Sequence, residues 1–210
     1  MEFLLLASAH FLALISPDPD FFIIVQTSLK KPLRYAFVVS AGIASANAFY
    51  LLIAIFGLEA IKDMSSLTLI LKYLGGAYLI FMGIMFLKSK KIVIRTHEDS
   101  IDNGSLKSQF VIGFLSGFLN PKNAIFYLSL FTLMVSPGTS IFTRVLYGVW
   151  MSFVVLFWDM SIAVLIGNKV VKERLFSWIY SIEKFSGIIL ISFGFFIGVV
   201  ADYFKNFVFV

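Results

Sequence analysis

The sequence has no cysteine and only two histidines in 210 residues. The first absence excludes disulfides, thiolate metal sites and thiol catalysis, and the second leaves few soft metal ligands. Charged residues are also scarce, at 14%, whereas 60% of the residues are hydrophobic and 25 are phenylalanine. A soluble chain of this length needs a mostly polar surface around one core. The composition therefore predicts a membrane protein with a single domain over residues 1–210, whose main partner is the lipid bilayer.

The net charge of +5 does not predict a nucleic-acid partner, because the basic residues fall in short stretches between apolar runs. The first residues, Met1, Glu2 and Phe3, lack the basic start of a signal peptide. We therefore expect the first apolar segment to be retained as a spanning helix.

Apolar segments long enough to cross a bilayer occur at residues 3–29, 35–58, 67–87, 110–135, 145–167 and 182–201. A crossing helix needs about 20 apolar residues. The runs are continuous and lack alternation with a period of two, so the sequence predicts an all-α fold with six transmembrane helices. The polar residues at about 89–107 predict a loop between the third and fourth segments.

Most lysines and arginines follow the first, third and fifth segments: Lys30, Lys31, Arg34, Lys88, Lys90, Lys91, Arg95, Lys107, Lys169, Lys172, Arg174 and Lys184. The opposite side carries only Lys62, Lys72, Arg144 and Lys205. Basic loops stay in the cytoplasm. This asymmetry predicts a multi-pass protein of the cytoplasmic (inner) membrane, with both termini outside and the loop at 89–107 inside.

The two halves of the chain repeat a glycine pattern. Gly76 and Gly83 are seven residues apart in the third segment, and Gly187 and Gly194 are seven apart in the sixth. The second and fifth segments each begin near a lone arginine, and the first and fourth are each interrupted by proline.

Three helices in each half would invert the second copy relative to the first, as in many secondary transporters. We therefore predict inverted repeats at about 1–91 and 108–210. The alternative is chance, because small residues are common wherever membrane helices pack closely.

The first apolar segment is interrupted by Ser16, Pro17, Asp18, Pro19 and Asp20. Proline breaks or kinks a helix, and freed backbone groups at membrane depth must be buried in protein or line a wet cavity. Acids inside a membrane usually belong to an ion or substrate path. Alternatively, the helix ends before Pro17 and both acids lie at the interface.

The fourth segment is interrupted in the same way by Asn120, Pro121 and Lys122. If the breaks are equivalent, Asp20 and Lys122 converge, which suits a zwitterionic substrate. Its ammonium would bind Asp20 or Asp18 and its carboxylate Lys122, assisted by the helix N-termini that follow each proline. The alternative is a structural salt bridge between Asp20 and Lys122, and the two can coexist.

These motifs resemble the LysE-type exporters, the lysine and homoserine/threonine (LysE/RhtB) family of amino-acid efflux proteins, over nearly the whole chain. The matching stretches are residues 16–21, against the family's Pro-Gly-Pro-Asp signature, together with 42–44, 71–79 with Gly83, 113–114 and 119–122. The resemblance implies export of amino acids driven by the proton-motive force. It supports functional roles for Asp20, Asn120, Pro121 and Lys122.

Two positions depart from the family pattern. Asp18 stands where the signature usually has glycine, and neutral Asn47 stands where the second helix usually carries an acid. A simple account is that the charge moved across one cavity. We therefore include Asp18 and Asn47 with Asp20, Asn120 and Lys122 as predicted substrate-binding residues.

Asp159 is a further acid inside an apolar segment. A carboxylate there could take and release a proton as the cavity opens to either side, so we predict proton coupling through Asp20 and Asp159. The alternative is an interfacial or hydrogen-bonded Asp159 near Trp158. His10 could also titrate, although a lone membrane histidine is more often a packing donor.

The sequence thus predicts a proton-coupled exporter of a small amino-acid-like solute. A divalent-cation exporter using Asp18, Asp20 and Asp159 is the alternative, which Lys122 at the same level disfavours. No cysteine, paired histidine or Ser/His/Asp pattern supports an enzyme, and no cofactor is expected. The substrate's identity and whether a homo-oligomer forms stay open.

Overall fold

The computed structural model describes residues 2–61, 63–89, 105–136, 138–166 and 169–196. Within these ranges the chain forms eight helices and no strand, which confirms the all-α class. The helices are α1 (Glu2–Ile15), α2 (Pro19–Lys30), α3 (Leu33–Ile61), α4 (Ser65–Lys88), α5 (Leu106–Leu119), α6 (Pro121–Met134), α7 (Ile141–Ile166) and α8 (Lys169–Phe195). The loop predicted at about 89–107 falls almost wholly outside the described residues, as does the C-terminus.

Each predicted apolar segment lies on one helix or on a broken pair, but α8 begins at Lys169, well before the expected start at residue 182. The basic residues expected in the loop after the fifth segment therefore lie within α8: Lys169, Lys172, Arg174 and Lys184. The segment 3–29 becomes α1 and α2, which meet at 54°, and the segment 110–135 becomes α5 and α6. Within the described chain α3, α4 and α7 are long and apolar enough to cross a membrane alone, and the bent pair α1–α2 adds a fourth candidate. Six crossings in two inverted repeats stay a prediction.

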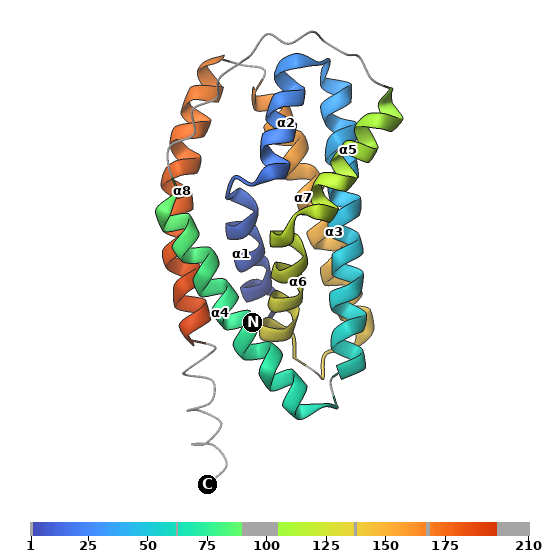
Figure 1. Cartoon of the computed structure of the whole chain (residues 1–210), viewed down its shortest axis with the longest axis vertical. Coiled ribbons are helices and arrows are strands. Elements are labelled where there is room, and N and C mark those ends of the chain that lie inside the picture. Colours follow the sequence, from blue (N-terminus) through green and yellow to red (C-terminus); the bar gives the residue numbers. More distant parts are fainter. Residues whose placement is uncertain (1, 62, 90–104, 137, 167–168, 197–210) are drawn as a thin grey trace.

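The two broken pairs lie side by side in the middle of the bundle (Figure 1). α1 rises from the lower end and α2 continues it to the upper end, whereas α5 descends from the upper end and α6 continues it downward. Both breaks therefore fall about halfway along the bundle.

Two apolar clusters lie on either side of the breaks. The larger joins α1, α6 and the lower part of α3, with Leu6, Leu51 and Phe131 fully or almost fully buried. The smaller joins α2, α7 and the upper part of α3 through Ile24, Val39 and Ile162. Polar side chains at the breaks are thus enclosed between two apolar layers, which limits their access to water.

Glycines allow the closest helix contacts. A Cβ atom on Gly113 of α5 would lie 2.1 Å from the Val39 carbonyl oxygen of α3. On the other side of the bundle, a Cβ atom on Gly83 would lie 2.5 Å from the Gly187 carbonyl oxygen, and one on Gly194 2.5 Å from that of Gly76. The glycines predicted to mark the two repeats therefore pack against one another, with α4 and α8 antiparallel.

Arg144 is not a loop residue, although the sequence suggested that it precedes the fifth helix. It lies in the first turn of α7 with no exposed side-chain surface, and its guanidinium is 3.0 Å from the Glu59 carboxylate of α3. The carboxylate provides the partner that a buried guanidinium needs. Arg144 is therefore a weak marker of topology.

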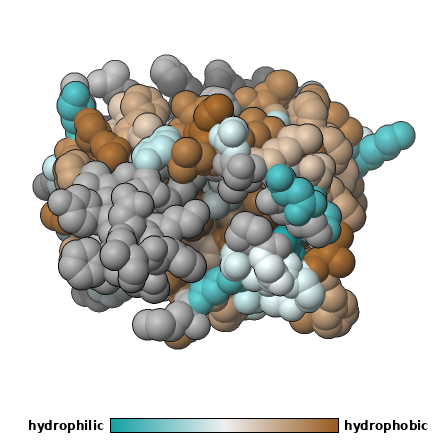
Figure 2. Space-filling model, turned by 90° about the horizontal axis from the view of Figure 1, so that it is seen from below, coloured by the Kyte–Doolittle hydropathy of each residue, from teal (hydrophilic) through white to brown (hydrophobic). Residues whose placement is uncertain are grey.

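The outer surface of the bundle is rich in exposed apolar side chains. Phe142, Phe153 and Phe157 on α7 are 69%, 66% and 77% exposed, and Leu119 at the end of α5 is 72% exposed. Seen from below, apolar residues lie along much of the described rim (Figure 2). A surface of this kind would be unfavourable in water and is suited to lipid.

Candidate functional site at the two helix breaks

At the first break, a side-chain cap starts the second helix. α1 ends at Ile15 and α2 begins at Pro19, which leaves residues 16–18 outside either helix. The Asp18 Oδ1 atom accepts a hydrogen bond from the Phe21 backbone N–H at 3.2 Å, so Asp18 is the N-cap of α2. Proline at the first helical position has no N–H that would need a partner. The local sequence thus starts a new helix at this point.

The second break consists of one residue. Asn120 separates α5 from α6, and its Oδ1 atom accepts a hydrogen bond from the Lys122 backbone N–H at 3.1 Å. Asn120 is 3% exposed. Its side-chain amide donates to Asp18 Oδ2 at 3.1 Å and to Asp20 Oδ2 at 3.2 Å. One asparagine therefore caps α6 and joins the two breaks.

Lys122 binds the first break rather than Asp20. Its Nζ atom lies 3.1 Å from Asp18 Oδ2 and donates to the carbonyl oxygens of Ala13 at 2.9 Å and Ser16 at 3.3 Å. A cation is stabilised at these carbonyls because the C-terminal end of a helix carries partial negative charge. The salt bridge considered between Asp20 and Lys122 is thus formed with Asp18 instead.

Asp20 is buried and surrounded by neutral donors. It is 5% exposed and accepts hydrogen bonds from Ser116 at 2.5 Å, from Asn120, and from Asn123 at 3.0 Å. These donors come from α5, α6 and the link between them, so Asp20 points into the bundle. Such a position does not fit the interfacial alternative for the first break.

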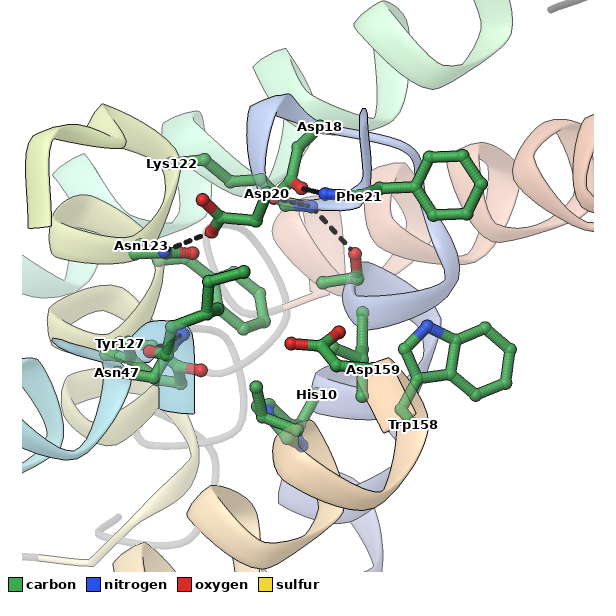
Figure 3. Close-up of a pocket in the computed structure, with 15 residues that line it drawn as sticks. His10, Asp18, Asp20, Phe21, Asn47, Lys122, Asn123, Tyr127, Trp158 and Asp159 are labelled. Carbon is green, nitrogen blue, oxygen red and sulfur yellow. Dashed lines mark hydrogen bonds and ion pairs between the residues drawn. The ribbon is translucent and has the colours of Figure 1, made fainter. Parts of the chain in front are cut away.

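A small cavity of about 40 Å³ lies beside these groups. Figure 3 shows Asp18, Asp20 and Lys122 on one side of it and His10 and Asp159 on the other. The space is sufficient for ordered water but too small for an amino acid.

Asp159 and His10 enter this cavity from α7 and α1 and are 6% and 1% exposed. Within the described part of the chain, Asp159 Oδ2 and both ring nitrogens of His10 have no hydrogen-bond partner. Buried polar atoms usually have one. The two side chains thus have unused hydrogen-bonding capacity next to the space, and Asp159 is buried rather than interfacial.

Asn47 also lines the cavity, from α3, and is 3% exposed. Its amide donates to the Ile43 carbonyl oxygen of its own helix at 2.9 Å. The predicted residues Asp18, Asp20, Asn47 and Lys122 therefore line one cavity. Asn120 does not line it but donates hydrogen bonds to Asp18 and Asp20.

Two contacts were missed by the sequence analysis. Ser116 and Asn123 both donate to Asp20, and Asn123 also donates to the Gly117 carbonyl oxygen at 3.1 Å. Residues three or four apart lie on the same face of a helix. Because Asn120 interrupts the helix between Ser116 and Asn123, helical spacing does not predict that both reach Asp20.

Comparison with known proteins identifies the family of the chain. Residues 11–200 match the family described as LysE type translocator. The threonine efflux protein of Escherichia coli (strain K12) is 30% identical over 202 residues, which cover 92% of this chain and 96% of that protein. The threonine efflux protein of Salmonella typhimurium is 29% identical over the same shares of both chains.

A further relative, an uncharacterized membrane protein of Haemophilus influenzae, is 26% identical over 191 residues, 88% of this chain and 90% of that protein. No solved structure matches the chain.

Proposed function

The chain belongs to the LysE type translocators, a family of membrane transporters, and we propose that it exports a small zwitterionic amino acid from the cytoplasm in exchange for protons. Threonine is the first substrate to test, because two of the relatives carry that name. The contacts at the two helix breaks support this proposal.

The observation that carries the proposal is the pair of oppositely charged groups at the breaks, the buried Asp20 and the partly buried Lys122. Asp20 is held by three neutral donors and forms no ion pair with the residues that the structure describes, so a substrate ammonium could pair with it. Lys122 is paired with Asp18 at 3.1 Å, and a substrate carboxylate would compete with Asp18 for it. Asn120 donates hydrogen bonds to both acids. These bonds would change when a substrate ammonium binds Asp20 or when a substrate carboxylate displaces Asp18 from Lys122.

The small volume of the cavity means that the substrate binds only after the helices move. Two inverted repeats would provide the motion, because each half could rock against the other about a central site. The antiparallel contact of α4 and α8 through matched glycines and the similar depth of the two breaks support this arrangement.

Protons are assigned to Asp20 and Asp159. Both acids are buried, and Asp159 faces the cavity with an oxygen that lacks a partner among the described residues. We propose that a proton taken up from outside is carried to the cytoplasm by these acids as substrate leaves.

The loop charges orient the exchange, with both termini outside. A cytoplasm-only reporter fused after Val210 should be inactive, and activity there would contradict this orientation.

A divalent-cation exporter is not favoured. In the part of the chain that the structure describes, no group of three or more acidic, histidine or cysteine side chains is placed to hold a metal ion. The ammonium of Lys122 between the acids would also repel a cation.

The test is uptake of labelled threonine into inside-out membrane vesicles with a proton gradient. Asp20→Asn keeps the size of the side chain and removes its charge, so uptake should fall at least about tenfold, the loss expected for a charge-assisted contact. The exposed Asp63 provides a matched control, and Asp63→Asn should transport normally.

Full activity of Asp20→Asn would remove Asp20 from the mechanism. The same vesicles distinguish the role of Lys122, since the decarboxylated amine of threonine should be transported by Lys122→Gln far better than threonine itself. If zinc or manganese moved instead of amino acids, the cation alternative would replace the proposal.

A further inference from the structure

A second, larger cavity lies on the opposite side of the Asp18–Lys122 ion pair. Its volume is about 480 Å³, and it is formed by the first break together with α4, α6 and α8. Asp18 and Lys122 line both this cavity and the smaller one. The ion pair is therefore the partition between two spaces, one of which is large enough for an amino acid.

Glu183 is the acid of this larger cavity. It lies on α8, is 6% exposed and accepts a hydrogen bond from the Ser16 hydroxyl at 3.2 Å. Neither the predicted site nor the proposed mechanism uses it. A buried carboxylate within a membrane bundle is costly and usually marks a path for ions or substrates.

We propose that Glu183 and Lys122 form a loading subsite for a zwitterionic amino acid in this larger cavity, with the Asp18–Lys122 ion pair as the gate to the inner site. This inference rests on the proposed function. Glu183 binds the ammonium of the incoming substrate, and Lys122 attracts its carboxylate. When the carboxylate displaces Asp18, the partition opens and the ammonium can pass to Asp20.

The remaining walls fit the rest of a small substrate. Phe81, Met82, Met85 and Phe86 of α4 give the cavity a mostly apolar lining with a few polar groups, as in most small-molecule sites. The opposite charges of Glu183 and Lys122 on this lining match the two ends of an amino acid.

The cavity lies beside the partition at the same depth, because the end of α4 packs against the second break: the Phe86 ring is 5.9 Å from the Lys122 Nζ atom, and Tyr78 donates to the Lys122 carbonyl oxygen at 3.3 Å. It reaches Lys88 and Ser89, where α4 ends before the loop that the charge pattern places in the cytoplasm. Lys184, next to Glu183, holds this end of α4 by donating to the carbonyl oxygens of Leu87 and Ser89, each at 2.6 Å. We expect substrate from the cytoplasm to enter past this end of α4 and to reach Glu183 first, an order that vesicles of the two orientations test.

Two variants separate binding from a purely structural role of Glu183. Glu183→Gln removes the charge but keeps an oxygen that can accept the Ser16 hydrogen bond, whereas Ser16→Ala removes that bond and keeps the charge. Glu2→Gln is the matched control, because Glu2 contacts Ser136 and Thr139 far from both cavities.

The measurement is threonine transport in inside-out and right-side-out vesicles. In inside-out vesicles, Glu183→Gln should raise the half-saturating threonine concentration about tenfold with little change in maximal rate. In right-side-out vesicles that concentration should be unchanged, Ser16→Ala should have a smaller effect than Glu183→Gln, and Glu2→Gln should resemble the wild type in both.

Three results would overturn the loading subsite while wild-type transport persists. Glu183→Gln could behave as the wild type, it could weaken transport equally from both sides, or Ser16→Ala could reproduce its effect, which would make Glu183 a structural link. Met85→Trp, which fills the cavity, should also raise the half-saturating concentration from the cytoplasmic side. If Met85→Trp leaves the half-saturating concentration unchanged, the cavity does not bind the substrate. Absence of transport by the wild type would instead contradict the proposed function.

Discussion

The break between α1 and α2 is three residues long and acidic, whereas the break between α5 and α6 is a single asparagine followed closely by a lysine. The first presents the carbonyl oxygens of Ala13 and Ser16 at the end of α1, and Lys122 of the second donates to both. The second caps itself through Asn120 and needs no cation of its own.

This difference shows that two similar proline interruptions perform complementary tasks. The first break is an acceptor for positive charge, built from carbonyl oxygens and carboxylates. The second supplies the ammonium of Lys122 and the amides of Asn120 and Asn123. A substrate with both charges can replace contacts that the two breaks make with each other, which is the physical basis of the proposed site.

The largest effect should come from removing the cation of the second break. Lys122→Gln leaves Asp18 and two carbonyl oxygens without their charged donor, so the free energy of unfolding should fall by about 3 kcal/mol, the lower end of the loss when a buried ion pair loses one member, because this pair is only partly buried. Denaturant titration in detergent measures it. Lys107→Gln, at an exposed position of α5, is the matched control.

Adding Asp18→Asn to Lys122→Gln separates stability from transport. The double variant has no uncompensated charge at the partition and should regain much of the lost stability. Threonine transport should stay low, because the substrate carboxylate has no cation to bind. If transport returned with stability, Lys122 would serve only to hold the first break.

A smaller effect is expected from the residue that joins the breaks. Asn120→Ala loses the cap of α6 and the amide that contacts Asp18 and Asp20, so unfolding should become easier by about 2 kcal/mol. Asn120→Ser keeps a capping oxygen without the amide and should lose less. Equal losses in the two variants would show that the amide contributes nothing beyond the cap.

The smallest effect should come from the proline at the start of α2. Pro19→Ala retains the Asp18 cap and the Lys122 contacts, and the added N–H lies in a first turn that needs no intrahelical acceptor. The variant should unfold more easily by less than about 1 kcal/mol and should transport normally. Loss of transport by properly inserted Pro19→Ala would show that the ring, rather than the cap and the lysine, keeps the break open.

The sequence by itself determined the class of the protein, the apolar part of each helix and the sites of both breaks, but not the start of α8 at Lys169. Hydropathy and proline act locally, because a run of apolar residues or a missing N–H has its effect wherever the chain goes next. The expected segments 3–29 and 110–135 accordingly appear as the broken pairs α1–α2 and α5–α6. Asp18, Asp20 and Lys122 could be selected as charged residues at such positions, whereas Asn47, inside α3, was selected only through the resemblance to the family.

Only the tertiary structure decided which of these residues meet. Lys122 pairs with Asp18 rather than Asp20, although both acids are adjacent in sequence to the same proline, because the carbonyl end of α1 draws its ammonium to that side. Arg144 is buried against Glu59, and Glu183 faces the larger cavity. Both contacts likewise join residues on different helices. Contacts between residues far apart in the chain depend on how the helices pack, and that packing is set by the whole bundle rather than by any one segment.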